Sequence, residues 1–263
     1  MKNLNNEKKW NNLLFWNDYC INTKDYQERL NTIINLIPED VKSIIDIGCG
    51  KGEIINYLKN KNNKKKIMGV DISDINKKHI TTKFLIGKLP KINVKNKSYD
   101  LVLCLEVLEH INSKNYYNSL DEIERIAKKY IIIGVPYNEN LDSKKIKCNI
   151  CKNIFHVDGH LKSFKEKDII NLFNKFVLKE RLLIGKPYKR KIKLLDQLNN
   201  FIDLYYQQDN FFCPYCNKYY KKINKISILK ILLRKIITLI HSFFLIFKKY
   251  KPYWIIALYK RVN

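Results

Sequence analysis

Short, continuous apolar runs alternate with amphipathic segments along most of the chain. The apolar runs predict strands over residues 43–47, 67–70, 84–86, 101–105, 130–135 and 176–184. Amphipathic helices are predicted between them over residues 52–60, 114–128 and 165–174. Buried parallel strands have this continuous apolar character, because helices cover both of their faces. The pattern therefore predicts an α/β fold with a doubly wound, mostly parallel sheet.

The same pattern divides the chain into four parts. We expect a helical segment over residues 1–40, stopped by Pro38, and a core domain over residues 41–186. A final strand-like run, from Tyr253 to Tyr259, makes residues 252–263 the last strand of the core. The stretch 187–251 is far too long for a hairpin loop. It is therefore expected to be an insertion with its own structure, forming a cap.

A glycine-rich loop lies between the first predicted strand and the helix after it. It reads Asp46-Ile47-Gly48-Cys49-Gly50-Lys51-Gly52, and Asp71 ends the next strand. In doubly wound folds a ligand lies at the carboxyl ends of the strands, where such an acid can bind ribose hydroxyls. The loop contains no Gly-Lys-Ser/Thr, which excludes a Walker phosphate loop. It also lacks the Gly-x-Gly-x-x-Gly spacing that dinucleotide-binding loops prefer.

This loop, Asp71 and the stretch 98–111 resemble class I S-adenosylmethionine-dependent methyltransferases, especially the small-molecule and quinone-type enzymes. The resemblance covers roughly residues 35–185 and the last strand. It implies a Rossmann-like sheet of about seven strands with an antiparallel final strand, and S-adenosyl-L-methionine as cofactor.

The resemblance also implies roles for single residues. Gly48, Cys49 and Gly50 would pass beneath the methionine part of the cofactor, Asp71 would bind the ribose and Ile72 would flank the adenine. Asp46 and Leu105 are also expected at the cofactor. One departure from the family is the stretch 87–90, Gly-Lys-Leu-Pro, where many members carry an acid that meets the adenine amino group. Backbone groups would have to hold the adenine here.

Three histidines are candidate catalytic residues. His156 and His160 follow the fifth strand, on the carboxyl side of the sheet, and could be a base, zinc ligands or ordinary loop residues. Histidine suits a base near neutral pH. His110 follows the fourth strand together with Glu106 and Glu109. We prefer to interpret Glu106, Glu109 and His110 as polar residues at the start of a helix.

Four of the cysteines form two Cys-x-x-Cys pairs, Cys148/Cys151 and Cys213/Cys216. Two such pairs can hold zinc in a tetrahedral site of zinc-ribbon type. Both pairs lie in segments that leave the sheet at its carboxyl end, so they can meet above the active site, and the zinc would be structural. The alternatives are a redox pair, free thiols, or a local metal site formed by Cys148, Cys151, His156 and His160. Three isolated cysteines are expected to be small buried residues: Cys20, Cys49 and Cys104.

The segment 226–247 is rich in Ile, Leu and Phe and carries one narrow polar stripe. The stripe consists of Lys230, Arg234, Thr238, His241 and Lys248. The uncharged part is shorter than the roughly 17–25 residues that cross a bilayer. A helix of this kind can lie in the interface of an anionic membrane. Packing on its own domain, or in a dimer, is the alternative.

The formal net charge of +25 favours anionic partners. However, 44 of the 50 basic residues are Lys, and only 6 are Arg, the residue best suited to phosphates and bases. The fourth strand is not followed by the Asn/Asp-Pro-Pro-Tyr/Phe signature of enzymes that methylate nucleic-acid amino groups. Nucleic acid is therefore the less favoured partner. No signal peptide or membrane-spanning run is found, so we expect a cytoplasmic protein, peripheral to a membrane if the helix binds lipid.

These observations support three hypotheses. The first is an S-adenosylmethionine-dependent methyltransferase for a small-molecule, glycan or lipid-linked acceptor at a membrane surface. The second is an RNA methyltransferase that uses the zinc module and the basic surface. The third is a methyltransferase-like binding module without activity.

Overall fold

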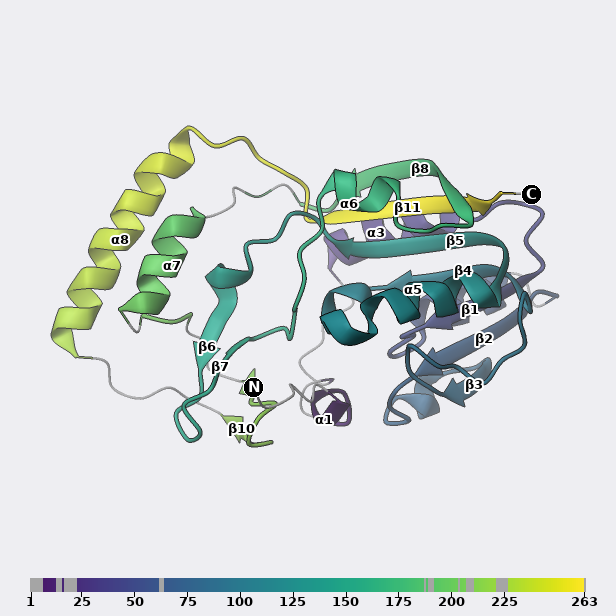
Figure 1. The fold of residues 1–263 in the computed structure, drawn as a ribbon, viewed down its shortest axis with the longest axis horizontal. Helices are drawn as coiled ribbons and strands as arrows, with labels where there is room; N and C mark the ends of the chain where they lie inside the picture. Colours follow the sequence, from purple (N-terminus) through teal and green to yellow (C-terminus); the bar gives the residue numbers. More distant parts are fainter. Residues whose placement is uncertain are drawn as a thin grey trace.

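A computed structural model describes residues 7–12, 16, 23–61, 64–186, 188, 192–202, 204–206, 211–220 and 227–262. Seven strands form one sheet in the order β3-β2-β1-β4-β5-β11-β8 (Figure 1). Their bounds are β1 Ser43–Ile47, β2 Lys66–Asp71, β3 Lys83–Ile86, β4 Tyr99–Leu105, β5 Ala127–Pro136, β8 Phe176–Ile184 and β11 Trp254–Arg261. Strand β11 runs antiparallel to both of its neighbours, β5 and β8, whereas the other pairs are parallel. The predicted doubly wound α/β sheet is confirmed.

Helices cover both faces of this sheet, and each face has its own apolar core. Their bounds are α3 Lys24–Asn35, α4 Glu53–Lys61, α5 Ser113–Ile126 and α6 Glu166–Ile170. Side chains alternate across a strand, so in β4 Val102 and Cys104 join the core beneath α5 and α6. Leu101 and Leu103 join the core beneath α3 and α4. This two-sided burial explains why the strands are continuously apolar.

Some predicted bounds were wrong. The helix predicted over 165–174 is only α6, and it ends early because Phe173 turns inward to pack on the core. Strand β5 begins directly after α5, before the predicted position, because Ala127 pairs with Tyr99 of β4. Cys49 and Cys104 are buried as predicted.

The predicted N-terminal helical segment is seen in α1, Glu7–Trp10, and in α3, which begins at the N-cap Thr23. The rest of that prediction, including Leu13, Leu14, Phe15 and Tyr19, lies outside the described residues, as do Cys20 and the lysines at 221, 222 and 225.

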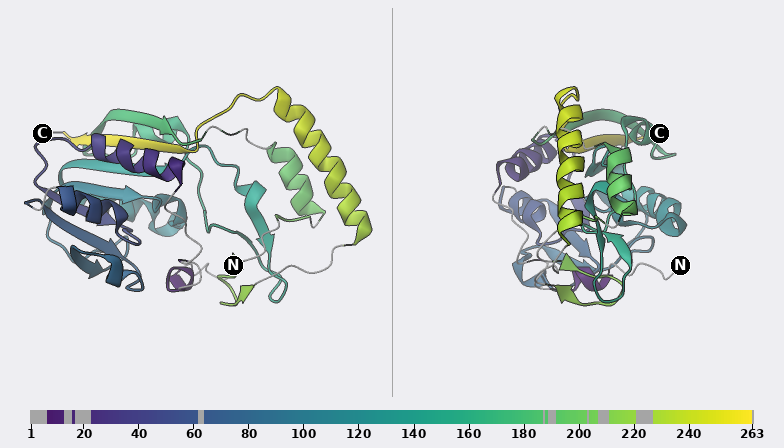
Figure 2. Two further views of the ribbon diagram at one scale, coloured as in Figure 1. Left: turned by 180° about the vertical axis from the view of Figure 1, so that it is seen from behind. Right: turned by 90° about the vertical axis from the view of Figure 1, so that its left-hand side faces the viewer.

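Two segments that are far apart in the sequence form a cap beside the carboxyl ends of the parallel strands (Figures 1 and 2). The chain between β5 and α6 contributes the 3₁₀ helix η3, Leu141–Lys144, and the hairpin of β6, Lys145–Lys147, with β7, Ile154–His156. The chain between β8 and β11 contributes α7 Lys193–Phe201, β9 Phe211–Phe212, β10 Tyr219–Tyr220 and α8 Ile228–Ile246. Ile146, Phe155 and Phe211 join the two segments in a small core of their own. None of the described helices has the length and hydropathy needed to cross a bilayer.

Candidate active site

The glycine loop between β1 and α4 is fixed by bonds to the end of β2. The backbone N–H groups of Gly48 and Cys49 donate to the carbonyl of Val70, at 2.7 and 3.1 Å. The N–H of Gly50 donates to Oδ2 of Asp71 at 2.9 Å. Gly48 has a φ of 79°, and a Cβ added there would overlap with the side chain of Val107. Glycine is therefore required at this position, where the backbone turns in the left-handed region.

Two cavities meet over this loop. The first has a volume of about 300 Å³ and is bordered by Asp71, Ile72 and residues 87–90. The second has a volume of about 410 Å³ and is bordered by the predicted cofactor residues Asp46, Cys49, Gly50 and Leu105. Residues common to both cavities are Trp10, Trp16, Gly48, Glu106 and His110. The structure thus brings together every residue that the sequence placed at the cofactor.

The shape and chemistry of the cavities fit S-adenosylmethionine. An acid at the end of β2 borders the first cavity, where a ribose would need it, and the side chain of Asp71 is fixed there by N–H groups of Gly50 and Ser73. The second cavity offers both signs of charge to an amino-acid group, from Arg29 and from Asp46. Burial and the nearby acids raise the pKa of Asp46 to about 7. The stretch 87–90 contributes a wall without an acid, as the sequence indicated.

The three candidate histidines lie in one row of rings behind Trp10. The centroids of Trp10 and His110, of His110 and His160, and of His160 and His156 are each 4.9 Å apart. His110 borders both cavities and His160 borders the second. His156 is not among the described residues that border either cavity. His110 and His160 are therefore the histidines placed to meet a bound molecule.

Hydrogen bonds fix which nitrogen of each ring is free. Nδ1 of His110 lies 3.1 Å from the carbonyl oxygen of Gly159, and Nδ1 of His160 lies 2.5 Å from Oε2 of Glu139. The carbonyl of Gly159 and the carboxylate of Glu139 both accept, so each Nδ1 carries the proton, and in the neutral ring the lone pair is then on Nε2. Burial also lowers the pKa of His110 well below its usual value. Both imidazoles thus offer a lone pair at Nε2.

Glu106 and Glu109 do not belong to the start of α5, so the preferred interpretation of these residues was wrong. Helix α5 is capped by Asn112 instead. Glu106 follows β4 with a φ of 56° and is held by Trp254, at 3.1 Å, and by Arg29, at 3.5 Å. Glu109 is fully buried in the 3₁₀ turn η2, Leu108–His110. Neither of its carboxylate oxygens has a hydrogen-bond partner within the described part of the chain.

Glu139, Arg29 and Trp10 were missed by the sequence analysis. Glu139 follows the end of β5, and polar residues in that position of a parallel sheet border the ligand crevice, so this signal was available. Burial raises the pKa of Glu139, but the bond from His160 and the nearby charges of His160, His156 and Lys144 together outweigh it and lower this pKa. No local pattern marks Arg29 or Trp10, because both reach the site from N-terminal helices.

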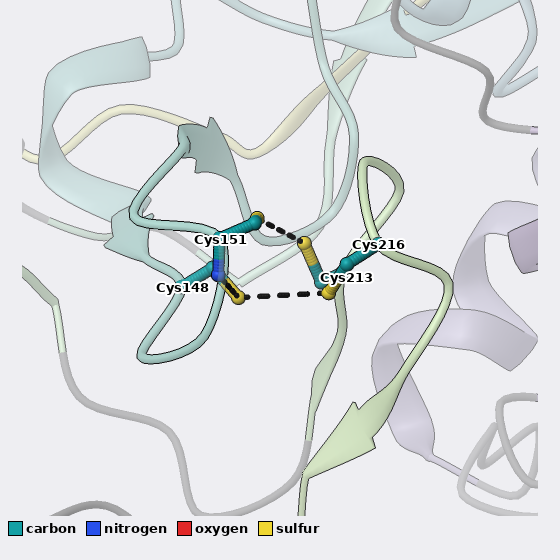
Figure 3. Close-up of side chains that lie close together, drawn as sticks. All are labelled: Cys148, Cys151, Cys213 and Cys216. Carbon is teal, nitrogen blue, oxygen red and sulfur yellow. Dashed lines mark hydrogen bonds between the residues drawn. The ribbon is translucent and has the colours of Figure 1, made fainter.

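The two cysteine pairs meet in the cap (Figure 3). Sγ of Cys148 lies 3.8 Å from Sγ of Cys216, and Sγ of Cys151 lies 3.6 Å from Sγ of Cys213. All four sulfur atoms are within 4.8 Å of one another. These separations are too long for disulfides, whose S–S bonds are about 2.05 Å. They are compatible with four thiolates around one ion.

Both pairs have the same local turn. The carbonyl of Cys148 accepts a bond from N–H of Lys152, and the carbonyl of Cys213 accepts one from N–H of Asn217. Lys152 and Asn217 are both in the left-handed region, with φ of 59° and 58°. Two equivalent turns of this kind direct four sulfur atoms to one point.

Comparisons with known proteins agree with this geometry. A family model of a methyltransferase domain matches residues 23–179. A SAM-dependent methyltransferase of Archaeoglobus fulgidus superposes with a TM-score of 0.51 at 17% identity, over 89% of this chain and 91% of that one. Another similar structure is the 1,6-didemethyltoxoflavin-N1-methyltransferase of Burkholderia thailandensis with bound 1,6-didemethyltoxoflavin and S-adenosylhomocysteine. It has a TM-score of 0.51 at 10% identity and covers 94% of this chain and 81% of that one.

The fold is that of a class I, Rossmann-like methyltransferase. The chain belongs to the family of methyltransferase domains. An uncharacterized protein of Methanocaldococcus jannaschii is 31% identical over 46% of this chain. The match spans about half of that relative, 52% of its length.

The bonds at Asp71 lead to a first prediction. Asp71→Ala should weaken binding of S-adenosylmethionine by about 1.5–3 kcal/mol, the range for hydrogen bonds to a charged group. Asp100→Ala is the matched control, because the Asp100 carboxylate also accepts two backbone N–H groups, from Lys42 and Ser43, on β1 away from the glycine loop. Calorimetric titration of both variants measures the difference. Equal affinity in Asp71→Ala and the unchanged protein would remove Asp71 from the cofactor site.

Proposed function

We propose that the protein transfers the methyl group of S-adenosylmethionine to a small-molecule, glycan or lipid-linked acceptor at a membrane surface. The main observation in support is the junction of the two cavities at Gly48, Glu106 and His110. The adenosine of a bound cofactor would lie in the first cavity and its amino-acid group beside Arg29 and Asp46 in the second, which brings the sulfonium to that junction. The acceptor would occupy the part of the second cavity beside His160. His110 borders this junction, and His160 borders the second cavity next to it.

The cofactor, when bound, supplies a methyl group on a sulfonium that is already a good leaving group. The chain has to align the acceptor and exclude water. Trp10 and Trp16 border both cavities and limit access of solvent to the junction. The backbone at Gly48 allows close approach, and His110 and His160 are the groups placed to activate an oxygen or nitrogen acceptor.

We further propose that the four cysteines bind one structural zinc ion. Cys148 and Cys213 are fully buried, and few apolar residues surround them in this small core. A core of this size gives limited stability by itself, and structural zinc contributes folding energy directly. The ion would join the loop after β5 to the insertion after β8, and so fix the cap over the acceptor cavity.

The orientation of α8 supports contact with a membrane. Its polar residues Arg234, Thr238 and His241 face a cavity shared with α7, and His241 lies 3.5 Å from the buried carboxylate of Asp196. Its apolar residues point outward: Leu239 is 70% exposed and Phe243 is 58% exposed. A helix on the surface of a protein in water normally has the opposite orientation. Contact with the apolar part of a membrane would remove these side chains of α8 from water.

The charge of this region is suited to anionic lipid. No Asp or Glu occurs anywhere from residue 210 to residue 263, whereas Lys and Arg recur throughout. Lys248, Lys249 and Lys251 directly follow α8 and would lie at the level of the lipid headgroups. Each basic residue near an anionic surface contributes roughly 1 kcal/mol of attraction.

The activity has a direct test. Purified protein incubated with radiolabelled S-adenosylmethionine should label a component of a membrane-lipid extract or of a soluble metabolite extract. His160→Asn should lower kcat about 10²-fold or more, the usual contribution of proton transfer by a positioned group. His156→Asn, behind it in the same row of rings, is the control and should lower kcat much less. Labelling of RNA alone, or of nothing, would contradict the proposal.

The zinc proposal predicts one zinc ion per chain by elemental analysis. Cys213→Ser should lose it and lower the melting temperature, because a structural zinc site is part of the folding energy. Cys104→Ser is the control: this thiol is also buried but lies in the sheet. A fully folded protein without zinc would rule the site out.

The membrane proposal predicts that the protein co-sediments with phosphatidylserine-containing vesicles more than with neutral phosphatidylcholine vesicles, and less at high salt. Leu239→Glu together with Phe243→Glu should abolish this, because each buried apolar side chain contributes about 1.5–3 kcal/mol. Tyr117→Glu, at a residue that is 74% exposed on α5, should have no effect. Failure of the soluble protein to co-sediment with anionic vesicles at low salt would contradict the proposal.

A further inference from the structure

Three possible metal ligands lie close together at and behind His110, which borders both cavities. Glu109 and His110 come from the turn η2, and His160 comes from the loop after β7. One donor atom from each lies within 4.8 Å of the other two. The N–H of Leu161 donates to the carbonyl of Glu109 at 2.7 Å and ties the two segments together. The arrangement is therefore held by the backbone as well as by the side chains.

The outer contacts of the two histidines are those of metal ligands. A metal-binding histidine usually donates its other ring N–H to a carbonyl or a carboxylate, which fixes the ring and its tautomer. His110 has the carbonyl of Gly159 in this role, and His160 has the carboxylate of Glu139. Each Nε2 lone pair is thereby left for an ion.

Glu109 supplies the third observation. A carboxylate that is fully removed from water normally has hydrogen-bond donors around it, because burial without them is costly. Glu109 is 0% exposed, and neither of its oxygens has a donor among the described residues. A cation beside it would supply the missing partner.

Two neighbouring groups of side chains are less suitable as ligands of a metal ion. Glu106 is already held by Arg29 and Trp254. His160 also belongs to a second cluster, with Glu139, His156 and Asp158. That cluster already contains a cation, because Nζ of Lys144 lies 2.7 Å from Asp158 and 4.0 Å from Glu139. Glu109, by contrast, has no hydrogen-bond donor within the described part of the chain, and His110 and His160 lie next to it.

We propose that Glu109, His110 and His160 bind one divalent transition-metal ion, with its open coordination positions facing the cavities. Two imidazoles and one carboxylate suit Zn²⁺, Fe²⁺ or Co²⁺. Resting on the proposed methyl transfer, the ion would coordinate a hydroxyl oxygen of the acceptor and lower its pKa, so that the proton passes to water before the oxygen attacks the methyl group. His110 and His160 would then activate the acceptor as ligands of the ion and not as bases. The acceptor class would then be an alcohol or a phenol that is methylated on oxygen.

The test uses Co²⁺ added to the full-length protein, followed by absorption spectroscopy. Cobalt held by nitrogen and oxygen ligands shows only weak visible bands, whereas cobalt held by the four cysteines adds intense thiolate charge-transfer bands. We expect one Co²⁺ per chain with the weak spectrum. Glu109→Gln and His160→Asn should each weaken its binding about tenfold or more, and Glu139→Gln about 10- to 100-fold.

The control is His241→Asn, which removes another buried histidine, in α8, and should leave Co²⁺ binding unchanged. Melting curves establish that each variant is folded. Calorimetry with S-adenosylmethionine separates the two proposals. If the proposed methyl transfer is wrong, the protein should not bind the cofactor. If only the metal site is wrong, the protein should bind the cofactor but not Co²⁺ at this site. Co²⁺ binding only at the cysteines, or binding at full strength by Glu109→Gln, would overturn the metal site.

Discussion

The site depends on how the ends of β1 and β2 are joined. The carbonyl of Val70 accepts two N–H groups of the glycine loop, and the carboxylate of Asp71 accepts a third, from Gly50. These bonds hold the loop in the left-handed turns that only glycine adopts easily, and they open the crevice at the carboxyl ends of the strands. Both cavities have this junction in their walls, since Gly48 borders each of them and Asp71 borders the first.

Most of the core could be predicted from the sequence, because strands buried on both faces leave a continuous apolar signal in it. The position of β11 between β5 and β8 could not be obtained that way, since nothing in its own residues specifies a neighbour. The resemblance to methyltransferases implied only that the final strand runs antiparallel. The short α6 could not be foreseen either, because the inward turn of Phe173 is a matter of tertiary packing.

The site was predicted in its parts but not in its connections. The meeting of the cysteine pairs followed from topology, since both segments leave the sheet at the same edge. Glu109 was misinterpreted because its burial without a donor is visible only in three dimensions. The polar stripe of α8 was found from helical spacing, yet its inward direction depends on Asp196 of α7, a residue far away in the sequence.

The central claim is that the crevice above the glycine loop binds the cofactor of methyl transfer. Hydrogen–deuterium exchange with and without S-adenosylhomocysteine tests it most directly, because bound ligand protects the backbone it covers. The account predicts slower exchange in residues 46–52, 71–73, 87–90 and 106–111, and little change in α8. Unchanged exchange in the glycine loop and after β2, at saturating ligand, would contradict it.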